Sequence, residues 1–479
     1  MTSYETIIGL EIHAQISTKT KMFCACDNDS FNRNPNSNVC PICMGFPGVL
    51  PVINREAIYK GIKTALALNC TIPLFSKFDR KNYFYPDLPY GYQISQYDDP
   101  ISKKGAIEIE LADGKLKTIG ITRLHLENDA GKLTHVLGGS LVDYNRAGTP
   151  LMEIVSEPDL RSGVEACLFA KMVQAILRTI GSSDADMEKG MMRFDASVST
   201  RPLGEEKLYP RAEIKNLNSF KALENAIDFE SKRQIILWEK GEPQDQQITV
   251  GWLDDRQETK LLRTKEDAAD YRYFPEPDLP PLHLDKAWIE TLRSELPELP
   301  LAKNKRFIKE YKISQGEALF FSQDPFLGNY FEEVAQVGGD PKLAASFIGT
   351  ILGGRLNREG LAFDQCKITT SNFGQLIKLI KAGTISNTVA KSTVFDAMYE
   401  TGESPEVIVE KNGLKQVSNV DALEEIIKKV ISENSSVVAD FRSGKQKAFG
   451  FLMGQIMKSS NGQANPQLVN EILQKELQV

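Results

Sequence analysis

Four prolines between residues 275 and 281 divide this chain into two parts that must fold differently. Proline fixes φ and lacks a backbone N–H, so the segment 273–284 predicts a stiff, extended connector. Before it, apolar and polar residues alternate in several segments, as in strands that bury one face. After it, apolar residues recur three and four positions apart, as in amphipathic helices. The sequence therefore predicts an α+β fold with a mixed N-terminal part and a helical remainder.

The chain of 479 residues is too long for one ordinary hydrophobic core, so we expect several domains. The proline connector marks the first boundary, and the polar, glycine-containing stretch 399–414 marks a second one. The predicted domains are residues 1–290, residues 291–405 and a helical tail of residues 406–479.

The N-terminal segment ETIIGLEIHAQI alternates strictly. Ile8, Leu10 and Ile12 share one face of the predicted strand, while Glu11 and His13 share the other. Comparable patterns predict an antiparallel sheet with further strands over 106–111, 119–128, 193–198 and 211–217, and helices over 55–69, 163–180 and 219–240.

Four of the seven cysteines crowd into residues 24–43, as CAC followed by CPIC. Two closely spaced thiol pairs can close a tetrahedral site with four sulfur ligands, which leaves no open position for catalysis. The sequence therefore predicts a structural zinc site, and the alternative is four reduced cysteines. The predicted ligands are Cys24, Cys26, Cys40 and Cys43.

The polar faces of the predicted strands carry carboxylates, histidines and cations. Carboxylates with a histidine suit Mg²⁺ or Mn²⁺, and interspersed arginine and lysine can hold phosphate. An ordinary solvated sheet face would also be polar, so both interpretations stay open. The residues concerned are Glu11, His13, Gln15, Arg123, His125, Glu127, Arg193, Asp195, Arg211, Glu213 and Lys215.

Residues 79–98, DRKNYFYPDLPYGYQISQYD, contain six aromatic rings beside Arg80 and Lys81. Pro86, Pro89 and Gly91 interrupt any strand ladder, which predicts an ordered loop. The loop either packs its own rings or covers a polar ligand.

Several motifs are absent from the sequence, namely the phosphate-binding P-loop, the G-x-G-x-x-G fingerprint and an amide-cleaving serine–lysine stretch. Any ATP would therefore need a sheet platform with metal ions. The net charge of −7 means that RNA would need a local basic patch. One candidate patch, at 442–458, surrounds Phe449 and Phe451 with Arg442, Lys445, Lys447 and Lys458, although a solvated helix edge would look alike.

These stretches together resemble one family. GLEIHAQI, CPICMGFPGVLPVIN, FDRKNYFYPDLPYGYQISQYD, RLHLENDAGK, NRAGTPLMEIVSEPD, MRFDASVS and RAEIKNLNSF are similar to the B subunits of the tRNA-dependent glutamyl/aspartyl amidotransferases, GatCAB. The resemblance runs nearly end to end. It implies a cradle domain with a zinc knuckle, a helical domain and a YqeY-like helical tail that binds tRNA.

The resemblance implies a cytoplasmic ligase. Such B subunits use ATP to phosphorylate the side-chain carboxylate of Glu on tRNA(Gln) or Asp on tRNA(Asn). Ammonia released from glutamine by an A subunit then displaces the phosphate, and a small C subunit braces the heterotrimer. No membrane is involved.

Site residues follow from the same resemblance. It implies magnesium ligands at Glu11, His13, Glu127 and Glu153. It implies catalytic roles for Lys81, Asp195 and Glu213. It implies contacts to ATP from Arg80, Arg211 and Lys215.

Two other functions remain open from sequence. One is a non-catalytic, zinc-containing subunit that binds tRNA, and the other is a self-sufficient amide ligase that uses free ammonia and a small acid.

Overall fold

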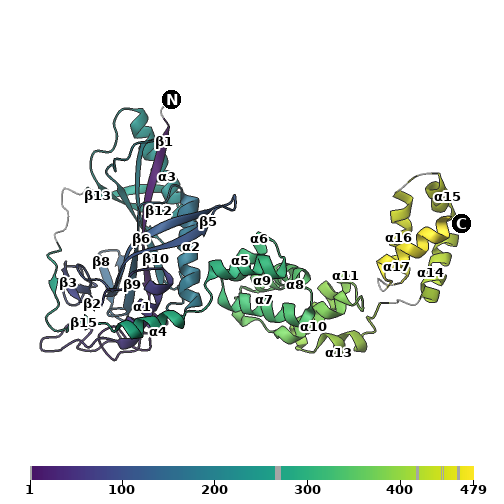
Figure 1. Ribbon diagram of the computed structural model, residues 1–479, viewed down its shortest axis with the longest axis horizontal. Coiled ribbons are helices and arrows are strands. Elements are labelled where there is room, and N and C mark those ends of the chain that lie inside the picture. The colour runs from purple at the N-terminus through teal and green to yellow at the C-terminus, as the bar shows by residue number, and fades with distance from the viewer. Residues whose placement is uncertain are drawn as a thin grey trace. The chain divides into compact units, whose positions relative to one another are not determined.

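The structure is a computed structural model that describes residues 3–264, 271–416, 420–443, 445, 447–460 and 464–478. It divides into two compact units, Met1–Ala302 and Lys303–Val479. The first unit contains the strands and the second is helical, so the predicted α+β fold class is confirmed (Figure 1).

The first unit is built on an eight-stranded sheet in the order β13-β12-β11-β10-β1-β9-β6-β5. Neighbouring strands are antiparallel except for the parallel pair β11 and β12. All five strands predicted from alternation belong to this sheet. Its strands are β1 (Tyr4–Gln15), β5 (Ser102–Glu110), β6 (Leu116–Asn128), β9 (Pro150–Ser156), β10 (Met192–Pro202), β11 (Ala212–Leu217), β12 (Ile248–Leu253) and β13 (Glu258–Thr264).

Helices α1 (Arg55–Ala67), α2 (Gly163–Thr179) and α3 (Phe220–Glu239) pack with the apolar face of this sheet. Ile8, Leu10 and Ile12 of β1 are completely or almost completely buried there. The three predicted helices are thus confirmed. Because one face of β1 lies in this core, alternation leaves Glu11 and His13 on the opposite face.

The aromatic segment forms a β-hairpin, so the prediction that it is a strand-free loop was wrong. β3 (Asp79–Asn82) pairs with β4 (Tyr92–Ser95), and Pro86 and Pro89 lie in the connection between them, where they interrupt no ladder. The proline connector also supplies short strands, which is compatible with proline at a sheet edge. The remaining strands are β2 (Phe75–Ser76), β7 (Lys132–Val136), β8 (Gly139–Asp143), β14 (Phe274–Pro275), which pairs with β3, and β15 (Leu282–His283).

The second unit has two hydrophobic cores, one from Phe307 to Val409 and one from Leu423 to Leu477. The helices of the first core are α5 (Pro300–Tyr311), α6 (Gln315–Ser322), α7 (Pro325–Gly338), α8 (Pro341–Phe347), α9 (Gly353–Glu359), α10 (Thr370–Lys381), α11 (Asn387–Val389), α12 (Phe395–Thr401) and α13 (Pro405–Lys411). The helices of the second are α14 (Val420–Glu433), α15 (Ser435–Arg442), α16 (Lys447–Ser459) and α17 (Pro466–Gln478).

Core packing shifts both predicted domain boundaries. Residue 290 falls inside α4 (Lys286–Ser294), and Leu292 belongs to the core of the sheet. Ile408 and Val409 of α13 belong to the first helical core, so a boundary at 405 would cut that core. We therefore propose boundaries after residues 302 and 414. No helix among the described residues is both long and apolar enough to cross a membrane.

We predict that Gly105→Ala strongly destabilises the first unit. A Cβ at Gly105 would lie 2.4 Å from Cys70 Sγ and 2.7 Å from the Leu68 carbonyl oxygen, because β5 passes against the end of α1. Overpacking of this kind costs about 1–3 kcal/mol. The measurement is denaturant unfolding beside Gly139→Ala, where no atom lies within 4 Å of the added Cβ. Equal stability of the two variants would contradict the packing of β5 on α1.

Candidate active site

Strand register gathers the predicted polar residues on one face of the sheet. His13 of β1 lies opposite Glu153 of β9 on one side and opposite Arg193 of β10 on the other. Glu11 lies opposite Asp195 of β10. Residues directly opposite each other share a face, with Cβ atoms about 4.5–5.5 Å apart. The polar face of the central strand is therefore the floor of a site with charged groups on both sides.

The first cluster consists of His13, Glu127 and Glu153, whose potential ligand atoms all lie within 4.8 Å of one another. His13 Nε2 is 3.2 Å from Glu153 Oε2, and His125 Nε2 is 3.5 Å from the same oxygen. Glu127 is 2% exposed and Glu153 is 8% exposed. Carboxylates buried this deeply do not belong to an ordinary solvated sheet face.

Charges within the first cluster favour ionised carboxylates. Burial raises the pKa of Glu153, but His125 and His13 outweigh it and hold that pKa well below the usual value. Burial also raises the pKa of Glu127, and His125 and Lys81 bring it below normal. Burial lowers the pKa of Lys81, yet Glu127 is the main cause of its net rise. The cluster is thus anionic and faces the half-buried ammonium group of Lys81.

The donors of this cluster fit a divalent cation. One imidazole and two carboxylates are ligands that Mg²⁺ and Mn²⁺ accept. Nδ1 of His13 and Nδ1 of His125 are buried without a hydrogen-bond partner in the described part of the chain. A ligand or a metal-bound group would satisfy such polar atoms.

Glu11 belongs to a second cluster, so its predicted place beside His13 needs correction. Potential ligand atoms of Glu11, Asp195 and Glu213 lie within 4.8 Å of one another. Alternation along β1 predicted the correct face for the Glu11 side chain. Its neighbours Asp195 on β10 and Glu213 on β11 depend on the order of the strands in the sheet, which alternation does not give. Lys215 Nζ lies 2.8 Å from both Asp195 and Glu213. Burial, followed by the charges of the neighbouring carboxylates, raises the pKa of Glu11.

Lys81 and Arg80 point to opposite faces of β3. Lys81 Nζ lies 5.0 Å from the ring centre of Tyr271 and 5.9 Å from that of Tyr83, beside the first cluster. Arg80 instead binds Glu276 through two hydrogen bonds of 2.7 and 2.8 Å and lies over the ring of Tyr92. These contacts hold the proline connector on the hairpin, so we withdraw Arg80 as a contact to ATP.

A cavity of about 540 Å³ adjoins the second cluster. Gln247 Nε2 is buried there and, within the described residues, has no hydrogen-bond partner. The cavity has room for a polar ligand that reaches Glu11. Its polar lining comprises Glu11, Thr122, Ser156, Ser197, Ser199, Tyr209, Arg211 and Gln247.

Rings of the aromatic hairpin have two different environments. Tyr83 packs edge-on to Tyr271, and Tyr273 stacks on Tyr97 with ring centres 4.2 Å apart. Phe84 and Tyr85, at the hairpin tip, are 83% and 61% exposed. The rings at the base of the hairpin, beside Lys81, therefore pack against one another, whereas those at its tip are exposed to solvent.

The four clustered cysteines have sulfur atoms within 4.8 Å of one another, as a tetrahedral metal site requires. The Cys40 N–H donates to Cys43 Sγ over 3.1 Å. A hydrogen bond from Cys24 is the main cause that lowers the pKa of Cys43 to about 5. Lys21 is fully buried, and its Nζ lies 3.8 Å from Cys43 Sγ. Buried positive charge beside a thiolate agrees with the predicted zinc ligands.

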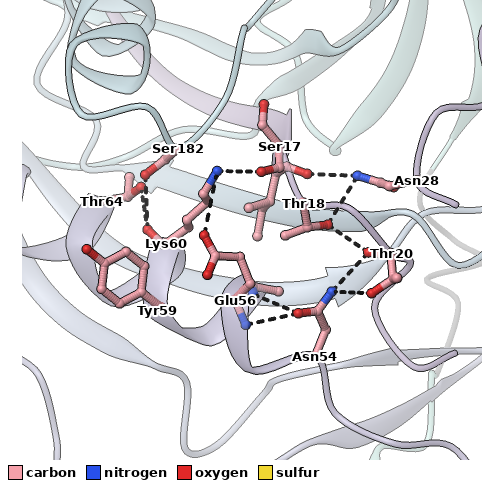
Figure 2. Close-up of polar contacts among 12 residues, drawn as sticks. Ser17, Thr18, Thr20, Asn28, Asn54, Glu56, Tyr59, Lys60, Thr64 and Ser182 are labelled. Atoms are coloured by element: carbon pink, nitrogen blue, oxygen red, sulfur yellow. Dashed lines mark hydrogen bonds and ion pairs between the residues drawn. The ribbon is translucent and has the colours of Figure 1, made fainter. Parts of the chain in front are cut away.

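A larger polar cavity of about 1010 Å³ lies at the base of the cysteine loop. Figure 2 shows that its polar groups mostly bind one another. Asn54 caps α1 by accepting from the Glu56 N–H, and its amide donates to the Thr20 carbonyl oxygen. Asn28 donates to Thr18, and Lys60 donates to the Ser17 carbonyl oxygen. This network anchors the cysteine loop to α1 and has a structural role.

Alternation placed His125 and Arg193 on the predicted polar faces, as candidates for metal or phosphate binding, but it gave neither a specific role. Asp129 was missed altogether. Asp129 directly follows β6 and is 2% exposed. Its partners are distant in sequence, and no local pattern identifies it.

Basic residues of the tail differ in availability. Arg442, Lys447 and Lys458 are exposed, whereas Lys445 Nζ lies 2.9 Å from Asp440. Phe451 is exposed, but Phe449 packs against Phe441. Their contact with tRNA remains a prediction.

Comparisons with known proteins cover almost the whole chain. Residues 6–290 match the family model of the GatB/GatE catalytic domain, and residues 329–477 match that of the GatB domain. Similar relatives are named as the B subunits of aspartyl/glutamyl-tRNA(Asn/Gln) amidotransferases. The relative from Carboxydothermus hydrogenoformans is 48% identical over 100% of this chain and 99% of its own length. Those from Thermoanaerobacter pseudethanolicus and Clostridium tetani are 49% and 46% identical, each over 99% of both chains.

We predict that replacing Cys40 and Cys43 together by serine releases about one zinc ion per chain and lowers the melting temperature, because metal binding and local folding are linked. Elemental analysis and thermal unfolding measure both effects. Cys366→Ser, outside the cluster, is the control and should retain zinc. Absence of zinc from the unmodified protein would contradict the assignment.

Proposed function

This chain belongs to the GatB/GatE family, and on that premise we propose that it uses ATP to phosphorylate the side-chain carboxylate of Glu or Asp on a misacylated tRNA. Ammonia then displaces the phosphate, which gives Gln-tRNA(Gln) or Asn-tRNA(Asn). Like its relatives, the chain is one component of a tRNA-dependent amidotransferase, a ligase complex. ATP use and the origin of the ammonia are part of our proposal.

The observation that carries the proposal is the pair of carboxylate clusters on one sheet face. Transfer of a phosphoryl group depends mainly on positioning and on neutralising charge. Mg²⁺ held by His13, Glu127 and Glu153, and by Glu11, Asp195 and Glu213, would supply that neutralisation. A carboxylate is a poor acceptor for ammonia, and phosphorylation gives it a leaving group. The floor thus supplies what the first half of the reaction needs.

Protein cations supplement this charge. Lys81 stays protonated beside Glu127 and can contact the substrate carboxylate or the transferred phosphate. Lys215 is held between Asp195 and Glu213, at the end of the floor that adjoins the 540 Å³ cavity. We place the nucleotide in that cavity, where Arg211 and the hydroxyl groups of Ser197 and Ser199 can contact it.

The aromatic side chains around Lys81 have a protective role in this proposal. Tyr83, Tyr271 and Tyr273 surround its approach to the first cluster. An acyl phosphate reacts readily with water, so apolar walls favour attack by ammonia.

Partners follow from what the chain lacks. Its sequence contains no amide-cleaving motif, so we assign ammonia production to an A subunit, with a small C subunit completing the complex. Misacylated tRNA is the substrate, and the cytoplasm, where charged tRNA is consumed, is the proposed compartment. A purely tRNA-binding subunit would leave the buried carboxylates of the floor without a role.

We predict that Glu127→Gln and His13→Ala each lower ADP release driven by Glu-tRNA(Gln) by about a hundredfold or more, because loss of a metal ligand removes several kcal/mol of charge stabilisation. Binding of tRNA should remain nearly unchanged. The assay is a Mg²⁺ titration beside Asp113→Asn, a control in an exposed turn. Near-normal rates at every Mg²⁺ concentration would place the ligands elsewhere. Free glutamate replacing Glu-tRNA(Gln) as substrate would instead indicate a self-sufficient ligase.

We predict that replacing Arg442, Lys447 and Lys458 together by alanine weakens tRNA binding. Each lost phosphate contact should reduce the salt dependence of the binding constant by about one unit of slope. Titrations at several stated salt concentrations measure this effect. The control removes three exposed positive charges from the first unit, at Lys232, Lys240 and Arg256. Equal tRNA affinity and slope in both triple variants would contradict a specific role of the tail.

A further inference from the structure

Arg193 lies on the floor between the two carboxylate clusters. It is opposite His13 of the first cluster in the pairing of β1 with β10. It precedes Asp195 of the second cluster by two residues, so both side chains share a face about 7 Å apart along the strand. The strand register therefore places the Arg193 side chain beside both clusters.

Asp129 fixes the position of this guanidinium. Arg193 Nη2 lies 3.1 Å from Asp129 Oδ1. Asp129 is itself held by Gln15, whose Nε2 donates to Oδ2 over 3.2 Å, and by Arg146, whose Nε lies 3.6 Å from Oδ2. Arg146 in turn donates to the carbonyl oxygens of Ala130 and Gly131. The carboxylate that positions Arg193 therefore has little freedom to move.

Most N–H groups of Arg193 have no acceptor among the described residues. A guanidinium has five N–H donors, and within the described chain Asp129 is the one acceptor that Arg193 reaches. Its side chain is 37% exposed. A fixed arginine with spare donors above a phosphate-binding floor is well placed to contact phosphate oxygens.

Other arginines of the first unit show what a structural role looks like. Arg80 directs two donors to Glu276, and Arg233 directs Nε and Nη2 to Glu230. Arg146 uses Nε and Nη2 on backbone carbonyl oxygens. Arg193 differs from these three because one nitrogen anchors it while its other N–H groups have no acceptor among the described residues.

We propose that Arg193 is a catalytic residue that donates hydrogen bonds to the phosphoryl group during its transfer, and that Asp129 is a positioning residue. In that step the bond from the γ-phosphorus to the bridging oxygen of ATP breaks, and its electron pair leaves with ADP. A carboxylate oxygen of the substrate forms the new bond to phosphorus. Arg193 keeps its proton throughout. This inference rests on the proposed function and adds a named contact to it.

The test compares Arg193→Ala and Arg193→Lys with Arg201→Ala in the full-length chain and its copurifying subunits. Arg201 lies on the same strand, away from both carboxylate clusters, where it pairs with Glu5 at 2.8 Å and donates to the Glu206 carbonyl oxygen. We expect Arg193→Ala to lower kcat for tRNA-dependent ADP release by about a thousandfold, the scale known for arginines at phosphoryl transition states. KM for ATP should change less than about threefold, since the contact strengthens in the transition state. Arg201→Ala should keep a near-normal kcat.

Three readouts separate a role in the chemistry from a merely structural role. Millimolar guanidinium should restore part of the kcat of Arg193→Ala and leave His13→Ala unchanged, which a merely structural role does not predict. Arg193→Lys keeps the positive charge but loses the planar guanidinium that can bind two oxygens at once, so its kcat should stay at least about tenfold below that of the unmodified protein. Asp129→Asn should lower kcat less than Arg193→Ala does, with the fold intact by melting temperature.

The outcomes distinguish the two proposals. No tRNA-dependent ADP release by the unmodified complex would overturn the proposed function. A different result is that the unmodified complex releases ADP normally while Arg193→Ala or Arg193→Lys has a kcat within about threefold of the unmodified value. That result would overturn the role of Arg193 and leave the proposed function intact. If Arg193→Ala does not fold, the folded Arg193→Lys variant decides the question by its kcat.

Discussion

The register of β1 between β9 and β10 is the constraint on which the rest of the structure depends. One face of β1 enters the core through Ile8, Leu10 and Ile12, and the other carries Glu11 and His13. Because side chains alternate, a slip of one residue would place these charges in the core and the isoleucines on the floor. Hydrophobic burial therefore fixes the register, and the register fixes which acidic groups meet. The chemistry of the floor is a consequence of how its opposite face packs.

Gathering carboxylates on a buried floor has an electrostatic cost, because a buried charge without a partner is strongly unfavourable. The fold offsets this cost with cations from separate elements, Lys81 from β3, Arg193 from β10 and Lys215 from β11. Lys81 reaches the floor only because β14 and β4 hold β3 on both sides. The ion pair of Arg80 with Glu276 secures that arrangement from the opposite face of β3. The proline connector thus helps to place the Lys81 ammonium group, for which we propose a role in catalysis.

Local patterns predicted what depends on local physics. Alternation located β1, β6, β10 and β11 and the correct face for His13 and Glu127, and sequence resemblance identified the family. Pairing between distant strands could not be read from the pattern, so Glu11 was assigned to the wrong cluster and Asp129 was not noticed. Pro86 and Pro89 led us to predict a loop without strands. They lie in the segment between β3 and β4, where they do not interrupt the pairing of the hairpin. Arg80 and Lys81 are adjacent in sequence, and only the orientation of β3 shows that one is structural. The domain boundaries that we propose differ from the predicted ones for a related reason, since the helices containing Leu292 and Ile408 pack on cores formed mostly by preceding residues.

The cysteine loop contacts the segment that joins β3 to β4 in the aromatic hairpin. It does not contact β3 itself, which carries Lys81, through any hydrogen bond among the described residues. Tyr90 donates to the Ile42 carbonyl oxygen, and Asn36 binds the backbone of Val142 and the side chain of Asp143. The nearby Tyr144 hydroxyl donates to the Pro86 carbonyl oxygen. Lys81 is instead held by backbone pairing on both sides of β3. Metal at the four cysteines would therefore brace the hairpin tip and the neighbouring β7–β8 hairpin, while the ammonium group stays in place through the sheet. Such a division lets the cysteine loop contribute to stability without taking part in the chemistry of the floor.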